Sequence, residues 1–249
     1  MAVCCTPSGY RKIFGARTAR RDLRKYRRRG LERTARLLVG FLTERGVEGD
    51  SVLEVGGGVG AIQLELLKAG AARTTNVELS PEYEPFAAEL FGDEAPVERR
   101  LGDFVRDADD LPRADDVVLH RVVCCYPDAE ALVGAAAEHA RRRLVLSFPP
   151  HTPLFRAGSA VFNAFLALTR TEFRTFIHPH ATIVGAARGL EPVFEARTRI
   201  WRVVGFERAR PEGEGTGALE EGATREPGRS PGTASRPDGR STGESEAGY

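Results

Sequence analysis

A glycine-rich segment, residues 51–60, is the feature that most constrains how this chain of 249 residues folds. A short apolar run carrying one acid, Glu54, leads into glycines at positions 56, 57, 58 and 60, and an amphipathic stretch follows. This pattern predicts a strand, a tight turn and a helix over about 59–69. Glycines let a ligand approach the backbone, and the N–H groups of a helix N-terminus favour an electron-rich ligand. The segment therefore predicts a loop that binds a nucleotide-like cofactor.

Apolar runs and amphipathic stretches alternate along most of the chain. We expect strands at 51–55, 74–79, 97–101, 116–123, 143–148, 193–200 and 201–206, with helical stretches between most of them. Strands that alternate with helices predict an α/β, Rossmann-like fold with a mostly parallel sheet and helices on both faces. Right-handed crossovers then bring the loops after the first, second and fourth strands to one edge, where ligands bind.

Composition divides the chain into three parts. With 41% hydrophobic residues, the chain can form one globular domain, which we place at 18–210 with an N-terminal helical cap. Residues 1–17 are expected to be a flexible N-terminus. In 211–249, Gly, Pro, Ser and Thr account for 21 of 39 residues, so this tail is expected to be disordered.

Charge is balanced overall but not locally. The formal net charge of +1 creates no global field that would favour nucleic acid. Residues 11–36, however, hold twelve arginines and lysines against two acids, a net charge of +10. This basic arm is either a solvated helix face or a contact for phosphates.

Two cofactors compete for the glycine loop. Gly56, Gly58 and Ala61 match the Gly-x-Gly-x-x-Gly/Ala pattern of a dinucleotide site. Glu54, Gly56, Gly58 and Gly60 match an S-adenosylmethionine site, in which an acid precedes Gly-x-Gly-x-Gly. An acid in an apolar strand is costly without a partner. Glu54 suits a ligand that carries an ammonium and a sulfonium, whereas it would repel a pyrophosphate.

Two further acids stand at strand ends. Glu78, followed by Leu79, ends the second strand, and its carboxylate can accept hydrogen bonds from both ribose hydroxyls. Asp103 follows the third strand, where it can accept from an adenine amino group while Phe104 covers the ring. Together with Glu54, these positions select S-adenosylmethionine over NAD.

Three segments resemble motif I, the ribose loop and the adenine loop of class I S-adenosylmethionine-dependent methyltransferases: residues 51–60, 75–80 and 101–104. The resemblance covers about residues 18–208 and implies a seven-stranded sheet with an antiparallel last strand. Two positions depart from the family, which often has aspartate where Glu54 stands and cysteine or serine where Gly57 stands. The length, the helical cap and the late helical insert are distantly similar to magnesium-protoporphyrin O-methyltransferases.

The resemblance also implies roles for individual residues. Glu54 and Gly56 would lie near the methionine moiety, and Glu78 would bind the ribose. Asp103 and Phe104 would contact the adenine.

The acceptor side depends on the end of the fourth strand. His120 has the pKa range of a general base for a hydroxyl or amine, or else anchors a loop by hydrogen bonds. Arg121 is a candidate contact for a substrate carboxylate. Cys124 and Cys125 are either small buried residues or reactive thiols. The Asn/Asp-Pro-Pro-Tyr/Phe signature of enzymes that methylate base amino groups is absent.

These features predict an enzyme that methylates a small molecule. We expect the apolar insert 153–170 and the N-terminal segment to cover the cleft in which that molecule binds. An RNA methyltransferase that uses the basic arm and a non-catalytic cofactor-binding protein are the alternatives. His151, His178 and His180 are second-rank candidates, and we expect no metal site. No signal peptide or membrane span is expected, and the cysteines are expected to be reduced, so we predict a cytoplasmic location.

Overall fold

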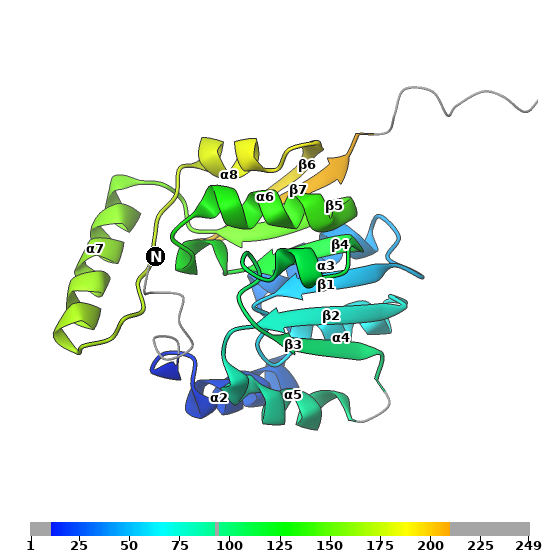
Figure 1. The fold of residues 1–249 in the computed structure, drawn as a ribbon, viewed down its shortest axis with the longest axis horizontal. Helices are drawn as coiled ribbons and strands as arrows, with labels where there is room; N and C mark the ends of the chain where they lie inside the picture. Colours follow the sequence, from blue (N-terminus) through cyan, green and yellow to red (C-terminus); the bar gives the residue numbers. More distant parts are fainter. Residues whose placement is uncertain (1–10, 93–94, 210–249) are drawn as a thin grey trace, which may run out of the picture. The chain divides into compact units, whose positions relative to one another are not determined.

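A seven-stranded sheet organises residues 11–92 and 95–209, which are the residues that the computed structural model describes (Figure 1). Its strands are β1 (Ser51–Val55), β2 (Arg73–Glu78), β3 (Val97–Leu101), β4 (Ala114–His120), β5 (Ala140–Phe148), β6 (Leu190–Arg197) and β7 (Arg202–Arg208). They lie in the order β3-β2-β1-β4-β5-β7-β6. The first five strands are parallel, and β7 is antiparallel to both neighbours. The α/β fold with an antiparallel last strand is thereby confirmed.

Helices cover both faces of this sheet. They are α2 (Ala16–Arg29), α3 (Arg33–Thr43), α4 (Ala61–Lys68), α5 (Glu84–Phe91), α6 (Ala129–His139), α7 (Pro153–Leu168) and α8 (His180–Ala186). Buried side chains of α3 and α4 share one apolar cluster with Val118 of β4, whereas those of α6 and α8 share another with Val117 and Leu119. Successive strand residues point to opposite faces, so β4 supplies both cores.

The boundaries of several strands differ from those predicted, and turns account for the differences at the ends of β4 and β6. β4 ends at His120 rather than at residue 123, because Arg121 has a φ of +60° and leaves the strand. β6 spans Leu190–Arg197 rather than 193–200, because residues 198–201 form a turn in which the Thr198 N–H donates to the Trp201 carbonyl at 2.8 Å. Both shifts come from turns that hydrophobic periodicity does not detect.

The ends of the chain are described only in part. Residues 1–10 and 210–249, including ten of the seventeen residues of the expected flexible N-terminus and the whole expected tail, lie outside the described residues. Within 11–17, α2 begins at Ala16, and Phe14 packs edge-on against Phe173 with ring centroids 5.4 Å apart. Gly30 separates α2 from α3 with a φ of +65°. Among the described helices, none is long and apolar enough to cross a membrane.

Candidate active site

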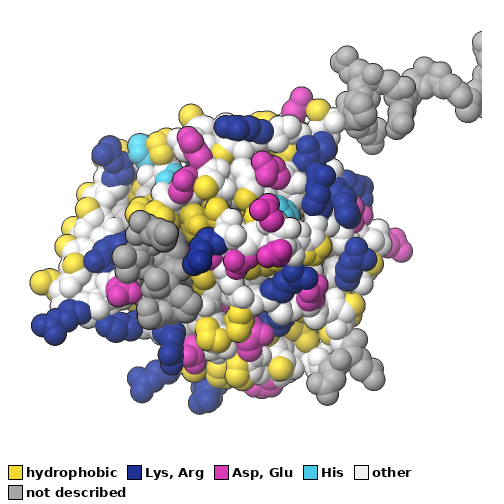
Figure 2. All heavy atoms as spheres, in the orientation of Figure 1, with side chains coloured by type: hydrophobic (Ala, Val, Ile, Leu, Met, Phe, Trp, Pro, Cys, Tyr) yellow, Lys and Arg dark blue, Asp and Glu magenta, His cyan; other side chains and the backbone are white. Residues whose placement is uncertain are grey.

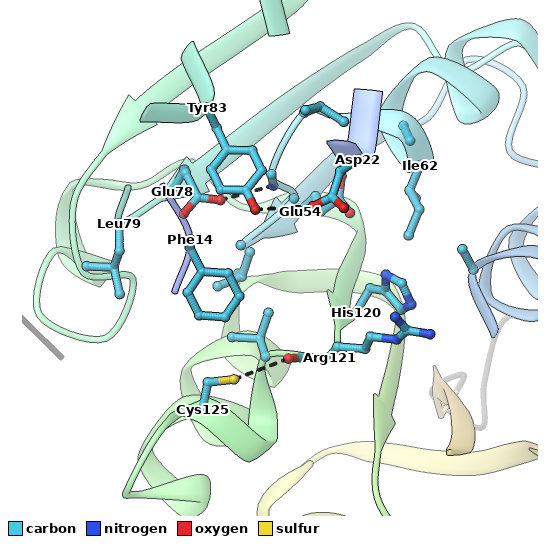
Figure 3. Close-up of a pocket in the computed structure, with 18 of the residues that line it drawn as sticks. Phe14, Asp22, Glu54, Ile62, Glu78, Leu79, Tyr83, His120, Arg121 and Cys125 are labelled. Carbon is cyan, nitrogen blue, oxygen red and sulfur yellow. Dashed lines mark hydrogen bonds between the residues drawn. The ribbon is translucent and has the colours of Figure 1, made fainter. Parts of the chain in front are cut away.

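A cavity of about 440 Å³ opens at the carboxyl edge of the sheet (Figure 3). The loops after β1, β2, β3 and β4 form its floor and walls, and the N-terminal segment with α2 and the start of α3 covers it. Apart from Gly60, every residue predicted to bind the cofactor lines this cavity, and so do His120 and Arg121. The fold therefore brings the two halves of the predicted site together.

The glycine loop has a backbone that side chains would disturb. Gly56, Gly58 and Gly60 have φ angles of +66°, +58° and +85°, which favour glycine. A Cβ on Gly56 would also stand 2.8 Å from Val122, and one on Gly60 would stand 2.5 Å from Phe91. The spacing of these glycines thus follows from the turn that leads from β1 into α4.

Glu54 is buried in the middle of β1 beneath this loop. Only 1% of it is exposed, and its Oε2 has no hydrogen-bond partner among the residues described. Burial raises the pKa of Glu54 to about 8, although the positive charge of Arg99 opposes the shift. The carboxyl group is therefore mostly protonated at neutral pH, and a cation placed beside it would favour its ionised form.

Gly57 lies directly over this carboxyl group. A Cβ at position 57 would come within 2.6 Å of Glu54 Oε2 and of Asn76 Oδ1, which accepts a hydrogen bond from the Gly57 N–H at 2.9 Å. The long side chain of Glu54 thus occupies space that a side chain at 57 would need. A glutamate at position 54 and a glycine at position 57 are therefore sterically compatible, whereas a side chain at 57 would overlap the Glu54 carboxyl group.

Glu78 ends β2 and faces the glycine loop. Its Oε2 accepts from the Gly58 N–H and its Oε1 from the Ser80 N–H, both at 3.0 Å. Burial raises the pKa of Glu78, and these backbone bonds oppose the rise. Leu79 is half-buried beside it in the cavity wall.

Asp103 and Phe104 follow β3. Asp103 Oδ1 accepts from the Val105 N–H at 3.0 Å and from the Tyr126 hydroxyl at 3.2 Å. Phe104 is buried against His139, with ring centroids 5.4 Å apart. Both residues line the cavity, so this wall combines the aromatic side chain of Phe104 with the carboxylate of Asp103, which accepts two hydrogen bonds.

Arg99 of β3 is a contributor that sequence reasoning missed. Its Nη2 donates to the Gly58 carbonyl at 2.8 Å, and its Nε donates to Glu84 at 3.0 Å. Arg99 therefore holds the glycine loop against α5 and places a positive charge near Glu54. An isolated arginine in a weak strand carries no sequence signal for this role.

Glu32, also missed, joins the helical cap to the end of β4. Its Oε1 lies 3.0 Å from His120 Nε2, and its Oε2 lies 2.6 Å from Arg121 Nη2. The same carboxylate caps α3 by accepting from the Ala35 N–H at 3.1 Å. Arg121 also stands over the ring of Trp201, 4.8 Å from its centroid. The four side chains form one cluster, and three of them, Glu32, His120 and Arg121, line the cavity.

The protonation of this cluster follows from burial and charge. Burial alone would raise the pKa of Glu32, but the hydrogen bond with His120 and the charge of Arg121 outweigh it and lower that pKa to about 2. Burial lowers the pKa of His120, and Glu32 opposes that shift. At neutral pH the ionised Glu32 can only accept, so the neutral imidazole carries its proton on Nε2. Nδ1 then holds the lone pair of a base.

The other candidates lie around this cluster without forming a second site. The thiols of Cys124 and Cys125 are 3.7 Å apart, and each lies 3.6 Å from the Arg121 carbonyl oxygen. His178 Nε2 lies 2.9 Å from the Tyr126 carbonyl oxygen, and His151 is exposed. Within 11–92 and 95–209, no group of three His, Cys, Asp or Glu side chains is arranged to hold a metal ion.

The fold is that of the class I S-adenosylmethionine-dependent methyltransferases, as the sequence predicts. No protein-family model and no curated protein matches the chain.

Among solved structures, magnesium protoporphyrin IX methyltransferase from Synechocystis PCC 6803 with bound SAH matches at 23% identity and a TM-score of 0.59, over 81% of this chain and 93% of that one. An O-methyltransferase family protein from Burkholderia thailandensis matches at 18% identity and a TM-score of 0.59, over 79% and 61%. Geranyl diphosphate C-methyltransferase from Streptomyces coelicolor A3(2) matches at 15% identity and a TM-score of 0.55, over 71% and 78%.

The steric link between positions 54 and 57 is testable by a double-mutant cycle. Gly57→Ser should lower the free energy of unfolding by ~1–3 kcal/mol, because the new Cβ overlaps Glu54 and Asn76. Adding Glu54→Asp retracts the carboxyl group and should recover much of that loss in urea unfolding. Gly185→Ser, where a Cβ would meet nothing within 4 Å, is the matched control. Strictly additive effects at 54 and 57 would contradict the link.

Proposed function

We propose that the protein transfers a methyl group from S-adenosylmethionine to a small-molecule acceptor. The observation that carries this proposal is the buried carboxyl group of Glu54, whose Oε2 has no hydrogen-bond partner among the residues described, under a glycine loop that borders the cavity. A buried acid without a partner lowers stability, so its presence points to a ligand that compensates it. A cationic ligand meets this need, whereas a pyrophosphate does not.

The residues around the cavity suit all three parts of this cofactor, which are methionine, ribose and adenine. Glu54 and Gly56 would hold the methionine part, and Glu78 the ribose hydroxyls. Leu79, Asp103 and Phe104 would hold the adenine. When bound, the cofactor supplies an activated methyl group, so the protein's own contribution is mainly to position the acceptor and to receive its proton.

His120 is the residue that we propose as proton acceptor. Its Nδ1 carries the lone pair because Glu32 holds the proton on Nε2, and Glu32 also fixes the ring orientation. A neutral imidazole in this position can take the proton of a hydroxyl or amine acceptor. Arg121, whose guanidinium is tied to Glu32 and Trp201, is proposed to position the acceptor, with a substrate carboxylate as its candidate partner.

A small-molecule acceptor fits the apolar character of the cavity wall, to which Phe14, Leu31, Ile62 and Val122 contribute. The structures with this fold include enzymes whose names specify a porphyrin and geranyl diphosphate as substrates. We therefore place the acceptor among small organic molecules. The cytoplasmic location stays a prediction from the sequence.

A nucleic-acid acceptor is the second candidate, because α2 presents an exposed row of basic side chains. Arg17, Arg24, Arg28 and Arg29 have no carboxylate partner among the described residues. Such a row could bind phosphates. Retention on heparin that salt removes, together with cofactor affinity that RNA increases, would favour this candidate. A non-catalytic cofactor-binding protein would transfer no tritiated methyl group to any component of a cell extract.

The assignment of Glu78 predicts a loss of cofactor affinity on substitution. Glu78→Ala should weaken binding of S-adenosylhomocysteine about tenfold or more in calorimetry, because hydrogen bonds to a charged group contribute ~1.5–3 kcal/mol. Glu78→Gln keeps one acceptor oxygen and should have an intermediate effect. Glu98→Ala, an exposed carboxylate on β3, should leave the affinity unchanged. Equal affinity for Glu78→Ala and the unsubstituted protein would refute the assignment.

The proposed base predicts a specific histidine titration. By nitrogen-15 NMR, His120 should titrate below 6.5, because burial disfavours its charged form. Glu32→Gln should lower this pKa further, because the carboxylate stabilises the imidazolium. A His120 pKa that does not respond to Glu32→Gln would show that the ring does not depend on Glu32.

A further inference from the structure

Helix α7 has its polarity reversed relative to an ordinary surface helix. Four positions, each about one helical turn from the next, face the protein: Phe155, Ser159, Asn163 and Leu166. The large side chains on the outer side are apolar, and they include Leu154 (78% exposed), Val161 (72%), Phe165 (58%) and Leu168 (83%). Arg156 is the helix's one charged residue. Water-facing helices of globular proteins show the opposite pattern.

Specific bonds fix this orientation. Asn163 Nδ2 donates to the Thr175 carbonyl, and the Thr175 N–H donates back to Asn163 Oδ1, both at 2.8 Å. Ser159 Oγ lies 2.8 Å from Thr175 Oγ1. Leu166 then packs with Phe173 in a small cluster. Because the polar side chains are committed to residue 175, the helix cannot turn its apolar side inward without breaking these bonds.

Basic side chains lie at both ends of the exposed apolar side. Arg156 lies in the first turn of α7, and Arg170 follows its last turn, with exposed Glu172 two positions further on. Arg174 is half-buried, and its Nη1 donates to the Phe173 carbonyl at 2.8 Å. The Lys12 ammonium donates to the Arg170 carbonyl at 2.8 Å, which places the start of the basic arm beside the same end of the helix. Figure 2 shows hydrophobic side chains along the edge formed by α7, with Lys and Arg side chains gathered below them.

We propose that α7 docks on the surface of an anionic lipid bilayer. A helix lying in the interface buries its apolar side among the acyl chains, while adjacent arginines and lysines bind anionic headgroups. Here the body of the protein covers the polar side of the helix. The charge pattern matches such a surface at both ends of α7.

A second copy of the chain fits this helix less well. A helix of 16 residues presents a strip of about 24 Å by about 10 Å, roughly 240 Å². Stable dimers bury about 800 Å² on each partner. The like-charged residues at the ends of α7 would also face one another across some pairings of two copies.

The side of α7 that faces the protein packs beside the cavity. The cluster of Leu166 and Phe173 includes Phe14, Leu79 and Cys125, and these three residues also line the cavity. Docking would thus bring lipid close to an apolar wall of the site. This step rests on the proposed function: the acceptor is then a lipid-soluble molecule that partitions into the bilayer.

Vesicle flotation with the full chain tests the docking without any cofactor. The protein should float with vesicles of phosphatidylcholine and phosphatidylserine, and at least tenfold less with phosphatidylcholine alone. The double variant Phe165→Ser/Leu168→Ser should lose at least tenfold in binding to the anionic vesicles. Val193→Ser, which alters an exposed apolar residue on β6, is the matched control and should bind as the unsubstituted protein does.

Other outcomes overturn the proposal. If the chain does not float with anionic vesicles, α7 is not a bilayer contact. If light scattering shows a dimer that Phe165→Ser/Leu168→Ser dissociates, a second copy covers the helix instead. Unchanged circular dichroism in the variants, and a second variant, Leu154→Ser, separate loss of docking from loss of fold. Vesicle binding without any affinity for S-adenosylhomocysteine would refute the proposed function and leave the docking intact.

Discussion

The buried carboxyl group of Glu54 is the constraint on which the site depends. A charge in the interior is expensive, so this group stays mostly protonated until a cation compensates it. The surrounding residues accommodate it: Gly57 leaves the space above it, Asn76 holds the loop N–H, and Arg99 ties the loop carbonyl to α5. A strand that is otherwise mostly apolar thus carries a buried acid that a bound cation would stabilise in its ionised form.

The second organising contact links the helical cap to the end of β4. Glu32 begins α3, yet it binds His120 and Arg121, 88 and 89 positions further along the chain. The Glu32 carboxylate therefore lines the cavity and caps α3. It also selects the tautomer of His120, the proposed base. Because Arg121 leaves β4 with a positive φ, its side chain can reach both Glu32 and Trp201.

The sequence predicts local pattern well and long-range partners poorly. The alternation of strands and helices and the glycine spacing were sufficient for the mostly parallel sheet and the cavity-lining acids, because parallel strand ends meet at one edge. The antiparallel last strand was implied only by the resemblance to class I methyltransferases. Glu32 and Arg99 were missed because their roles depend on contacts with residues distant in the chain. The reversed polarity of α7 was also missed, because periodicity shows that a helix has two sides but not which side faces the protein.

Proton exchange on cofactor binding tests the central claim most directly. Calorimetry of S-adenosylmethionine binding in buffers of different ionisation enthalpy measures the protons released. We predict proton release near neutral pH and an affinity that rises with pH, by up to ~10-fold per unit below about pH 8, with both effects lost in Glu54→Gln. Binding that exchanges no protons, with the same affinity at all these pH values, would contradict the account.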